Sequence, residues 1–227
     1  MEKKIGKICA EGLSFFGKTN RLISHELKNI LAIISETLGL LDELVELSGK
    51  GMELKPERLR SMSDSIIEEV ERANTVIRCM NTLAHSVDKF ITEVDIGQAL
   101  SLVVELSHLD SAFRKTKLRL VKSETQVIYT SPLFLEMLIY QVLNYALRGA
   151  GPEGEIRISF DCKDNDARIT FSGIASNISD EFPTKKEALF AEALSGEVSL
   201  DVAAGELHID LPRKIGESHI GSLVSND

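Results

Sequence analysis

The chain has 227 residues, 43% of them hydrophobic, so it can bury a core and is not expected to be disordered. Its net charge of −9, with scattered basic residues, excludes a nucleic-acid-binding face, because phosphates are neutralised by clustered positive charge. No apolar run reaches the ~20 residues of a membrane crossing, and the first residues lack the pattern of a signal peptide. We therefore expect a cytoplasmic globular protein, with no nucleic acid and no membrane insertion.

Two long helices are predicted in the first part of the chain. Between about Leu13 and Leu47, apolar residues recur at intervals of three and four, which is typical of a helix with one buried stripe. The segment "SGKGMELKP" then breaks the helix, and Pro56 suits the first turn of a second one. The second helix extends to about Phe90, with a stripe close to a heptad repeat: Leu59, Met62, Ile66, Val70, Ala73, Ile77, Met80 and Ala84.

Two long helices joined by a short loop form an antiparallel hairpin. Such a hairpin cannot cover both of its apolar stripes by itself, so two copies pairing into a four-helix bundle is the economical arrangement. We therefore expect a homodimer.

The character of the sequence changes after the hairpin. A helix is predicted over 96–112, then strands at "KLRLV" and "QVIYT", a helix over 133–147, strands at "GEIRISF" and "ARITFSG", a helix over 185–194, and two final strands. Strands with helices on one side indicate a two-layer α/β sandwich, so the fold class is α+β. The expected domains are a helical hairpin over 1–92, the sandwich over 93–213 and a flexible tail over 214–227.

One strip of the first helix carries polar residues at positions that share a face: His25, Lys28, Asn29, Ala32 and Glu36. This strip lies roughly opposite Leu27, Leu31, Ile34 and Leu38, so His25 is predicted to face water. Imidazole is largely neutral at cellular pH, and its lone pair can attack phosphorus. The adjacent Glu26 can orient or deprotonate the ring, and Asn29 can hold a water in line with a bound phosphoryl group.

The residues S-H-E-L-K-N, followed by "ILAI", resemble the H box of the dimerisation and phosphotransfer domain of bacterial sensor histidine kinases. The resemblance extends over most of the chain. It implies that His25 is the phospho-accepting residue, Glu26 an assisting acid or base, and Asn29 the amide used when such proteins dephosphorylate a partner. Ile30 stands where the family often has proline, which should leave the helix straighter.

Receiver domains are expected to dock beside His25, on the strip that includes Lys28, Ala32, Glu36 and Gly39. The other histidines lack an acid and an amide in comparable positions, and we interpret them as structural or surface residues: His85, His108, His208 and His219. The three cysteines, Cys9, Cys79 and Cys162, have no metal-type spacing and are interpreted as small apolar residues.

The second domain resembles the catalytic ATP-binding domain of the same kinases, but its ligand positions differ. Aligning "EGEI" with the family's "GGxIxV" strand puts Tyr145 at the Mg²⁺-binding asparagine and Gln141 at an earlier asparagine. Asn144 is one position away, and a shift of one residue turns a helical side chain by ~100°. The resemblance therefore implies that the metal ligand is missing.

The adenine motif Asp-x-Gly-x-Gly of the family is replaced by Ser172, Gly173, Ile174, Ala175 and Ser176. The chain between Ser172 and Ala188 is also too short for a nucleotide lid. We therefore expect a sandwich without a lid that binds no ATP, metal or other cofactor.

A phospho-accepting histidine without its own phosphate donor resembles the dimeric histidine phosphotransferases of bacterial phosphorelays. The resemblance implies phosphoryl relay between the aspartates of two receiver domains through His25, with Mg²⁺ supplied by the receiver. A scaffold or inhibitor related to kinases, or a phosphatase of receivers, is the alternative, and an active ATP-dependent kinase is disfavoured.

Overall fold

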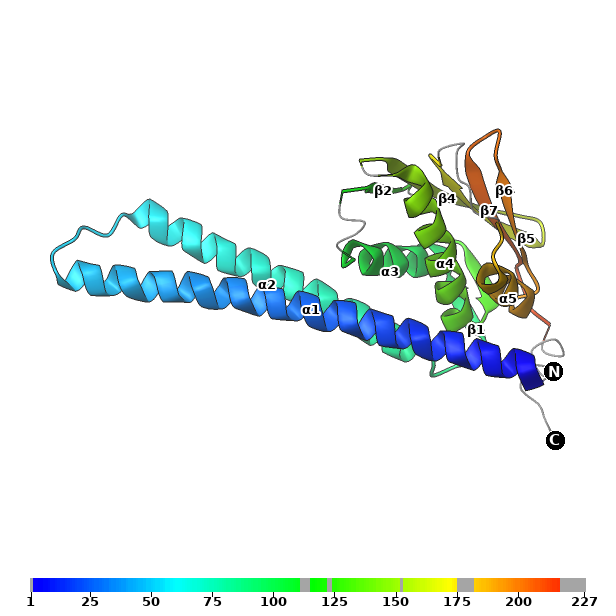
Figure 1. Cartoon of the computed structure of the whole chain (residues 1–227), viewed down its shortest axis with the longest axis horizontal. Helices are drawn as coiled ribbons and strands as arrows, with labels where there is room; N and C mark the ends of the chain where they lie inside the picture. The colour runs from blue at the N-terminus through cyan, green and yellow to red at the C-terminus, as the bar shows by residue number, and fades with distance from the viewer. Residues whose placement is uncertain (1, 111–114, 122–123, 152, 175–181, 217–227) are drawn as a thin grey trace. The chain divides into compact units, whose positions relative to one another are not determined.

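The computed structural model describes residues 2–110, 115–121, 124–151, 153–174 and 182–216 (Figure 1). It contains two compact units. One comprises residues Thr19–Asn81 and is a helical hairpin. The other combines Met1–Lys18 with Thr82–Asp227 and contains the strands.

The hairpin is built from α1 (Glu2–Gly49) and α2 (Pro56–His85), which run antiparallel in Figure 1. The turn between the two helices contains Gly51. Gly51 adopts a φ of 94°, a region that favours glycine, and the Met52 amide donates to the Leu47 carbonyl at 3.1 Å. Pro56 is the first residue of α2, where its missing N–H costs nothing, as predicted.

The apolar stripe of α1 is divided between two faces. Ile23, Ile30 and Leu44 are buried, whereas Leu31 and Leu38 are 62% and 49% exposed. A helix that packs against a single partner helix buries only a narrow seam, because the helix surface curves away on both sides. The predicted stripe through Leu31 and Leu38 is therefore not covered within one chain.

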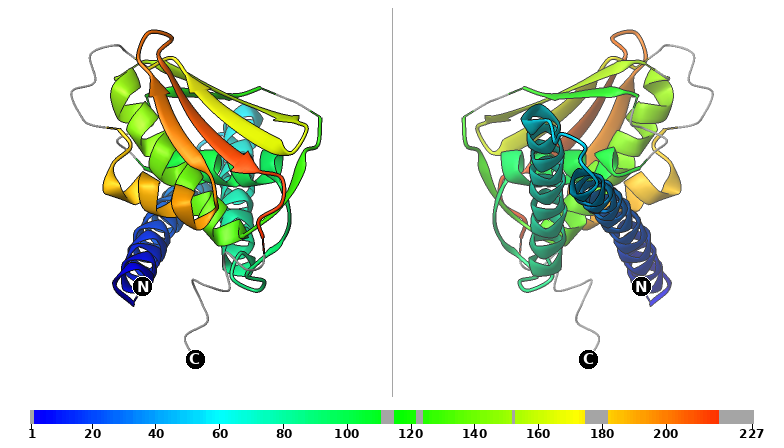
Figure 2. Two further views of the ribbon diagram at one scale, coloured as in Figure 1. Left: turned by 90° about the vertical axis from the view of Figure 1, so that its right-hand side faces the viewer. Right: turned by 90° about the vertical axis from the view of Figure 1, so that its left-hand side faces the viewer.

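The second unit is a two-layer α/β sandwich, and the α+β fold class is confirmed (Figure 2). Its helices are α3 (Ile96–His108), α4 (Pro132–Ala150) and α5 (Lys185–Ala193). The main sheet has the order β2-β4-β5-β7-β6, made of β2 (Lys117–Leu120), β4 (Glu155–Lys163), β5 (Asp166–Ser172), β7 (Glu206–Pro212) and β6 (Glu197–Asp201). Only the β2–β4 pairing is parallel among these strand pairs.

A separate two-stranded sheet, not predicted as such, pairs β1 (Thr92–Asp95) with β3 (Val127–Thr130). Asp95 also caps α3, because its carboxylate accepts from the Gln98 amide at 3.2 Å. The chain thus turns from strand to helix at a single residue, which ties α3 to the small sheet.

Strict alternation along the central strands forms the core. Ile158 of β4 lies opposite Phe171 of β5, which in turn lies opposite Leu207 of β7. All three side chains are fully buried, on the sheet face that α4 covers, while the intervening residues are polar. Burying one face and solvating the other sets the register of these strands.

Both ends of the sandwich unit differ from the predicted domain boundaries. Ile8 and Phe15 of α1 are buried in the same core, and the Phe15 and Tyr140 rings lie 5.2 Å apart. The predicted tail begins at 214, yet Ile215 is buried and its amide donates to the Tyr129 carbonyl at 3.0 Å. The core of the sandwich unit thus includes apolar side chains that lie outside the predicted range 93–213.

Glu136 of α4 is a buried carboxyl group in this core. Its Oε1 accepts from the Ser86 hydroxyl at 2.6 Å, while Oε2 is buried without a hydrogen bond from the described residues. Burial raises the pKa of Glu136 from an ordinary value of 4.5 to about 7, against the opposing effect of the Ser86 hydrogen bond. The folded state therefore holds a proton that the unfolded chain releases.

This carboxyl group predicts a pH-dependent stability. The cost of ionising buried Glu136 in the folded state is absent below pH 4.5 and complete above pH 7. The unfolding free energy should therefore fall by as much as ~3 kcal/mol over that range. Glu136→Gln should be less sensitive to pH and more stable than the unmodified protein at pH 8. Urea unfolding can be followed by near-UV dichroism, because all three tyrosines (Tyr129, Tyr140 and Tyr145) belong to the sandwich unit and the chain has no tryptophan. Exposed Glu105→Gln is the control, and equal slopes for both variants would contradict this prediction.

Candidate functional site

His25 lies in the middle of α1 with an exposed side chain, as the helical spacing predicted. Its Nδ1 lies 3.2 Å from the Asn29 Nδ2, one helical turn further along. Within the described part of the chain, this is the one hydrogen bond that the imidazole makes. Nε2, the other ring nitrogen, has no hydrogen bond from the described residues.

Glu26 lies on a different face of α1 from His25. Its side chain is 5% exposed and forms an ion pair with Arg72 of α2, whose Nε donates to the carboxylate at 3.0 Å. Arg72 also contacts Glu69, with Nη1 and Oε2 3.2 Å apart. Although burial opposes it, these two carboxylates raise the pKa of Arg72. Glu26 therefore links the two helices, and its predicted role as an assisting acid or base stays a prediction.

The predicted docking residues are all exposed: Lys28, Ala32, Glu36 and Gly39. A Cβ added at Gly39 would meet no described atom within 4 Å, so this part of the strip is open to a partner. Leu40 and Leu47 are exposed on the same side of α1, by 50% and 37%. Their spacing from Glu36 and Gly39 follows the helical repeat, and this spacing was the sequence signal that could have added them to the predicted docking strip.

The other described histidines have different surroundings. His85 is exposed at the end of α2, and its Nδ1 lies 2.8 Å from Asp88, an acidic partner that the sequence interpretation missed. His208 lies in β7, with Nδ1 3.2 Å from the Thr170 hydroxyl. His108 is exposed at the end of α3, and His219 lies outside the described residues. None of the three described histidines has an amide on its ring, unlike His25.

Tyr145, which the sequence comparison aligns with the Mg²⁺-binding asparagine of the kinases, belongs to an aromatic cluster. Tyr145 is 1% exposed, and its ring centroid lies 4.7 Å from that of Phe182. The Arg148 guanidinium lies 5.8 Å from the same ring. Asn144, one position earlier, is half-buried, and its Nδ2 donates to the Tyr140 carbonyl at 2.7 Å. Gln141, at the earlier asparagine position, is half-buried on the same helix.

The segment that follows β5 is also closely packed. Ile174 is 6% exposed, and its amide donates to the Gly205 carbonyl at 3.1 Å. Gly173 has a φ of 104°, and a Cβ there would lie 2.2 Å from the Glu155 carbonyl oxygen. Glycine is thus required by the close approach of the backbone. Ala175, Ser176 and the predicted absence of a lid lie outside the described residues.

These contacts predict that the sandwich binds ATP poorly, if at all. A tyrosine replaces the amide oxygen expected for Mg²⁺, and Ser172 stands at the position of the aspartate whose carboxylate would accept from the adenine amino group. Calorimetric titration with Mg-ATP should therefore show no binding at millimolar nucleotide. A dissociation constant of ~1 mM or tighter, equivalent to about −4 kcal/mol, would contradict this prediction.

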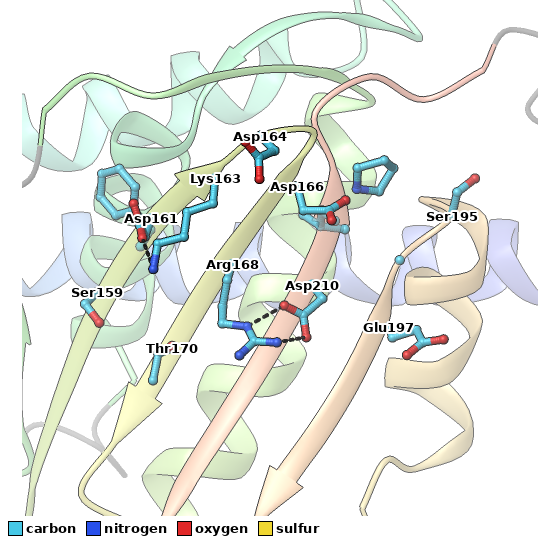
Figure 3. A pocket seen from close by; sticks show the side chains of 14 residues that line it. Ser159, Asp161, Lys163, Asp164, Asp166, Arg168, Thr170, Ser195, Glu197 and Asp210 are labelled. Atoms are coloured by element: carbon cyan, nitrogen blue, oxygen red, sulfur yellow. Dashed lines mark hydrogen bonds and ion pairs between the residues drawn. The ribbon is translucent and has the colours of Figure 1, made fainter.

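A hollow of about 760 Å³ lies on the outer face of the sheet (Figure 3). Its centre is an ion pair, in which Arg168 Nε and Nη2 donate to Asp210 at 2.6 and 3.1 Å. At its edge, Lys163 and Asp161 lie 3.3 Å apart. Arg168 and Lys163, the basic residues of the lining, are thus each paired with a carboxylate, and we assign no chemistry to this hollow.

The described residues offer neither a cluster of metal ligands nor a membrane-spanning helix. No three His, Cys, Asp or Glu side chains among them come together in a way that could hold a metal ion. None of the described helices combines the length and the apolar character that spanning a membrane requires.

Comparisons with known proteins are informative at the level of structure. No protein-family model matches the sequence, and no curated protein matches it. A structure described as a bacterial phosphotransferase is 13% identical over 87% of this chain and 95% of that chain, with a TM-score of 0.50. A histidine kinase from Burkholderia phymatum is 12% identical over 87% of this chain and 99% of that chain, with a TM-score of 0.46.

The catalytic domain of histidine kinase ThkA is 10% identical over 56% of this chain and 99% of that domain, with a TM-score of 0.46. At such identities the likeness concerns the fold alone. The chain therefore shares the fold of the bacterial phosphotransferase structure over most of its length.

Proposed function

We propose that this protein is a histidine phosphotransfer protein, which relays a phosphoryl group between receiver aspartates through His25 without binding ATP. The observation that supports it most is the contrast between two positions. The His25 ring is exposed and has an amide on Nδ1, whereas Tyr145 and Ile174, which align with the metal-binding asparagine and a motif glycine of the kinases, are buried. A nucleophile is thus available while a phosphate donor is not.

Transfer of this kind requires little from the chain itself. The Nε2 lone pair attacks phosphorus, and the receiver carboxylate leaves. Mg²⁺ bound in the receiver's acidic cluster neutralises the charge on the moving phosphoryl group, so no metal ligand is required beside His25. The hairpin has to present the imidazole and a surface that fits a receiver.

The apolar residues left exposed on the hairpin favour a homodimer. They occur on both helices, with exposed fractions between 39% and 62%: Leu31, Leu38 and Val45 of α1, and Ile67, Val70 and Ile77 of α2. We name this set the apolar bundle face. Intervals of three and seven keep the members of each helix on one side, which is the spacing of helices in bundles. A second copy of the same hairpin would cover them in a four-helix bundle.

Receiver docking is proposed on the opposite side, beside His25. Ala32→Arg would place a long charged side chain one turn beyond Asn29, where space is needed for a partner helix. Affinity for a receiver should fall by at least ~10-fold, the effect of ~1.4 kcal/mol lost at an interface. Surface plasmon resonance can measure it, with exposed Asn165→Arg of the sandwich as a matched charge control. Unchanged affinity in Ala32→Arg would move the docking site elsewhere.

A receiver phosphatase is the second candidate, favoured by the position of Asn29. Its amide lies beside the place where a phosphoryl group would arrive, and it can hold a water in line with phosphorus. A scaffold or inhibitor that only binds receivers is the remaining alternative. These functions differ in what becomes of the label on a phosphorylated receiver.

Incubation with a ³²P-labelled receiver and an unlabelled second receiver distinguishes the three. Relay places label first on this protein and then on the second receiver. Phosphatase activity releases inorganic phosphate without labelling this protein, and a scaffold leaves the label where it was. Failure of any receiver from a broad panel to label the protein would overturn the proposed function.

A further inference from the structure

The two polar neighbours of His25 are used very differently. Glu26 is directed to Arg72, 46 residues away in the sequence, and is almost fully buried by that contact. The Asn29 carboxamide, in contrast, contacts the imidazole itself at Nδ1. Asn29 is therefore the residue placed to influence which ring nitrogen carries the proton.

We propose that the Asn29 carboxamide, and not the Glu26 carboxylate, selects the tautomer in which His25 reacts. The inference rests on the proposed phosphotransfer and assigns Asn29 the role of a positioning residue. With its NH₂ group toward Nδ1, as in the structure, the amide donates to the lone pair there and leaves the proton on Nε2. This is a resting form, because neither nitrogen then offers a free lone pair.

Rotation of the Asn29 carboxamide by about 180° creates the reactive form of the His25 ring. Its carbonyl oxygen then accepts the proton of Nδ1–H, and the lone pair lies on exposed Nε2. A bond forms between Nε2 and phosphorus while the bond from phosphorus to the receiver's aspartate oxygen breaks, and the electron pair stays on that carboxylate. The ring becomes an imidazolium, and its Nδ1–H donates a hydrogen bond to the Asn29 carbonyl oxygen. The reverse transfer follows the same steps backward.

The amide accelerates transfer overall because the two hydrogen bonds differ in strength. A hydrogen bond to the neutral resting ring is weaker than one from the charged ring that forms with the new bond. The difference corresponds to a change of about fivefold in the rate of acceptance. Loss of Asn29 should therefore slow His25 without removing its reactivity.

Nitrogen-15 spectroscopy of the full chain tests the tautomer independently of transfer. The unmodified protein should show a scalar coupling across the hydrogen bond between Asn29 Nδ2 and His25 Nδ1, with the neutral ring protonated on Nε2. Asn29→Ala should lose the coupling and shift the Nδ1 resonance. Asn29→Asp offers only acceptor oxygens, so it should move the proton to Nδ1. Glu26→Gln should leave the His25 resonances in place.

Rates of acceptance from a ³²P-labelled receiver complete the test. Asn29→Ala should be about fivefold slower than the unmodified protein. Asn29→Asp should be faster than Ser24→Asp, which adds the same charge at an exposed position next to His25 on another face of the helix.

The outcomes separate this inference from the proposed function. Identical His25 resonances in Asn29→Ala and the unmodified protein would overturn the role of Asn29, whether or not label is transferred. A shift of those resonances in Glu26→Gln but not in Asn29→Ala would return the role to Glu26. Absence of labelling with the expected spectra would leave the tautomer assignment standing and refute the relay.

Discussion

His25→Ala is expected to abolish labelling of this protein by a phosphorylated receiver, and with it relay to a second receiver. Removing an assisting acid or base typically costs ~10²–10⁴ in rate, whereas removing the nucleophile leaves no covalent route at all. The fold should be unaffected, because the ring is exposed and its hydrogen bond among the described residues is to Asn29, one turn away on the same helix. Dimerisation should also persist, since His25 lies outside the apolar bundle face.

His85→Ala is the matched control for this experiment. His85 is exposed, as His25 is, and has an acidic partner in Asp88, with the ring nitrogen and the carboxylate 2.8 Å apart. It should therefore accept label if an oriented imidazole alone were sufficient. Labelling that survives in His25→Ala and disappears in His85→Ala would show that the phospho-accepting residue had been misassigned.

Leu38→Asp is expected to convert the proposed dimer to a monomer. The side chain is 49% exposed in one chain but would be buried at the centre of a four-helix bundle, where each of the two copies would place an unpaired carboxylate. A penalty of several kcal/mol per copy weakens association by more than ~10³-fold. Sedimentation equilibrium at micromolar protein measures the change.

Leu40→Asp is the control, because Leu40 is 50% exposed and only two residues away. Two residues correspond to ~200° around the helix, so Leu40 faces the His25 side instead. This variant should remain dimeric while its affinity for a receiver falls. Dissociation of both variants to the same extent, or a monomeric unmodified protein, would refute the proposed apolar bundle face.

Much of the fold could be predicted because it depends on local periodicity. Intervals of three and four residues predict a helix and its apolar side, and alternation at strands such as β4 and β5 predicts which residues enter the core. The exposure of His25 follows from the same helical spacing, and so do the exposed positions of Ala32 and Gly39. Gly51 and Pro56 likewise determine locally where the hairpin turns.

Periodicity does not specify which surface covers an apolar face. Residues 2–18 continue the helix of the hairpin, yet Ile8 and Phe15 are buried in the sandwich core. The helical pattern is the same whichever partner the side chains pack against. The choice depends on the shape and apolar area of a surface formed by residues far away in the sequence, which exists only once the chain has folded.

By itself, then, the sequence determined two helices with a break at Gly51 and Pro56, an α/β sandwich, and an exposed histidine with Glu26 and Asn29 beside it. Only the tertiary structure decided how those two neighbours are used. Glu26 forms an ion pair with Arg72 of α2, because a carboxylate buried between helices requires a cation. Asn29 meets His25 through the local helical turn. Tyr145 likewise lies in an aromatic cluster only because folding brings Phe182, 37 residues later, against its ring.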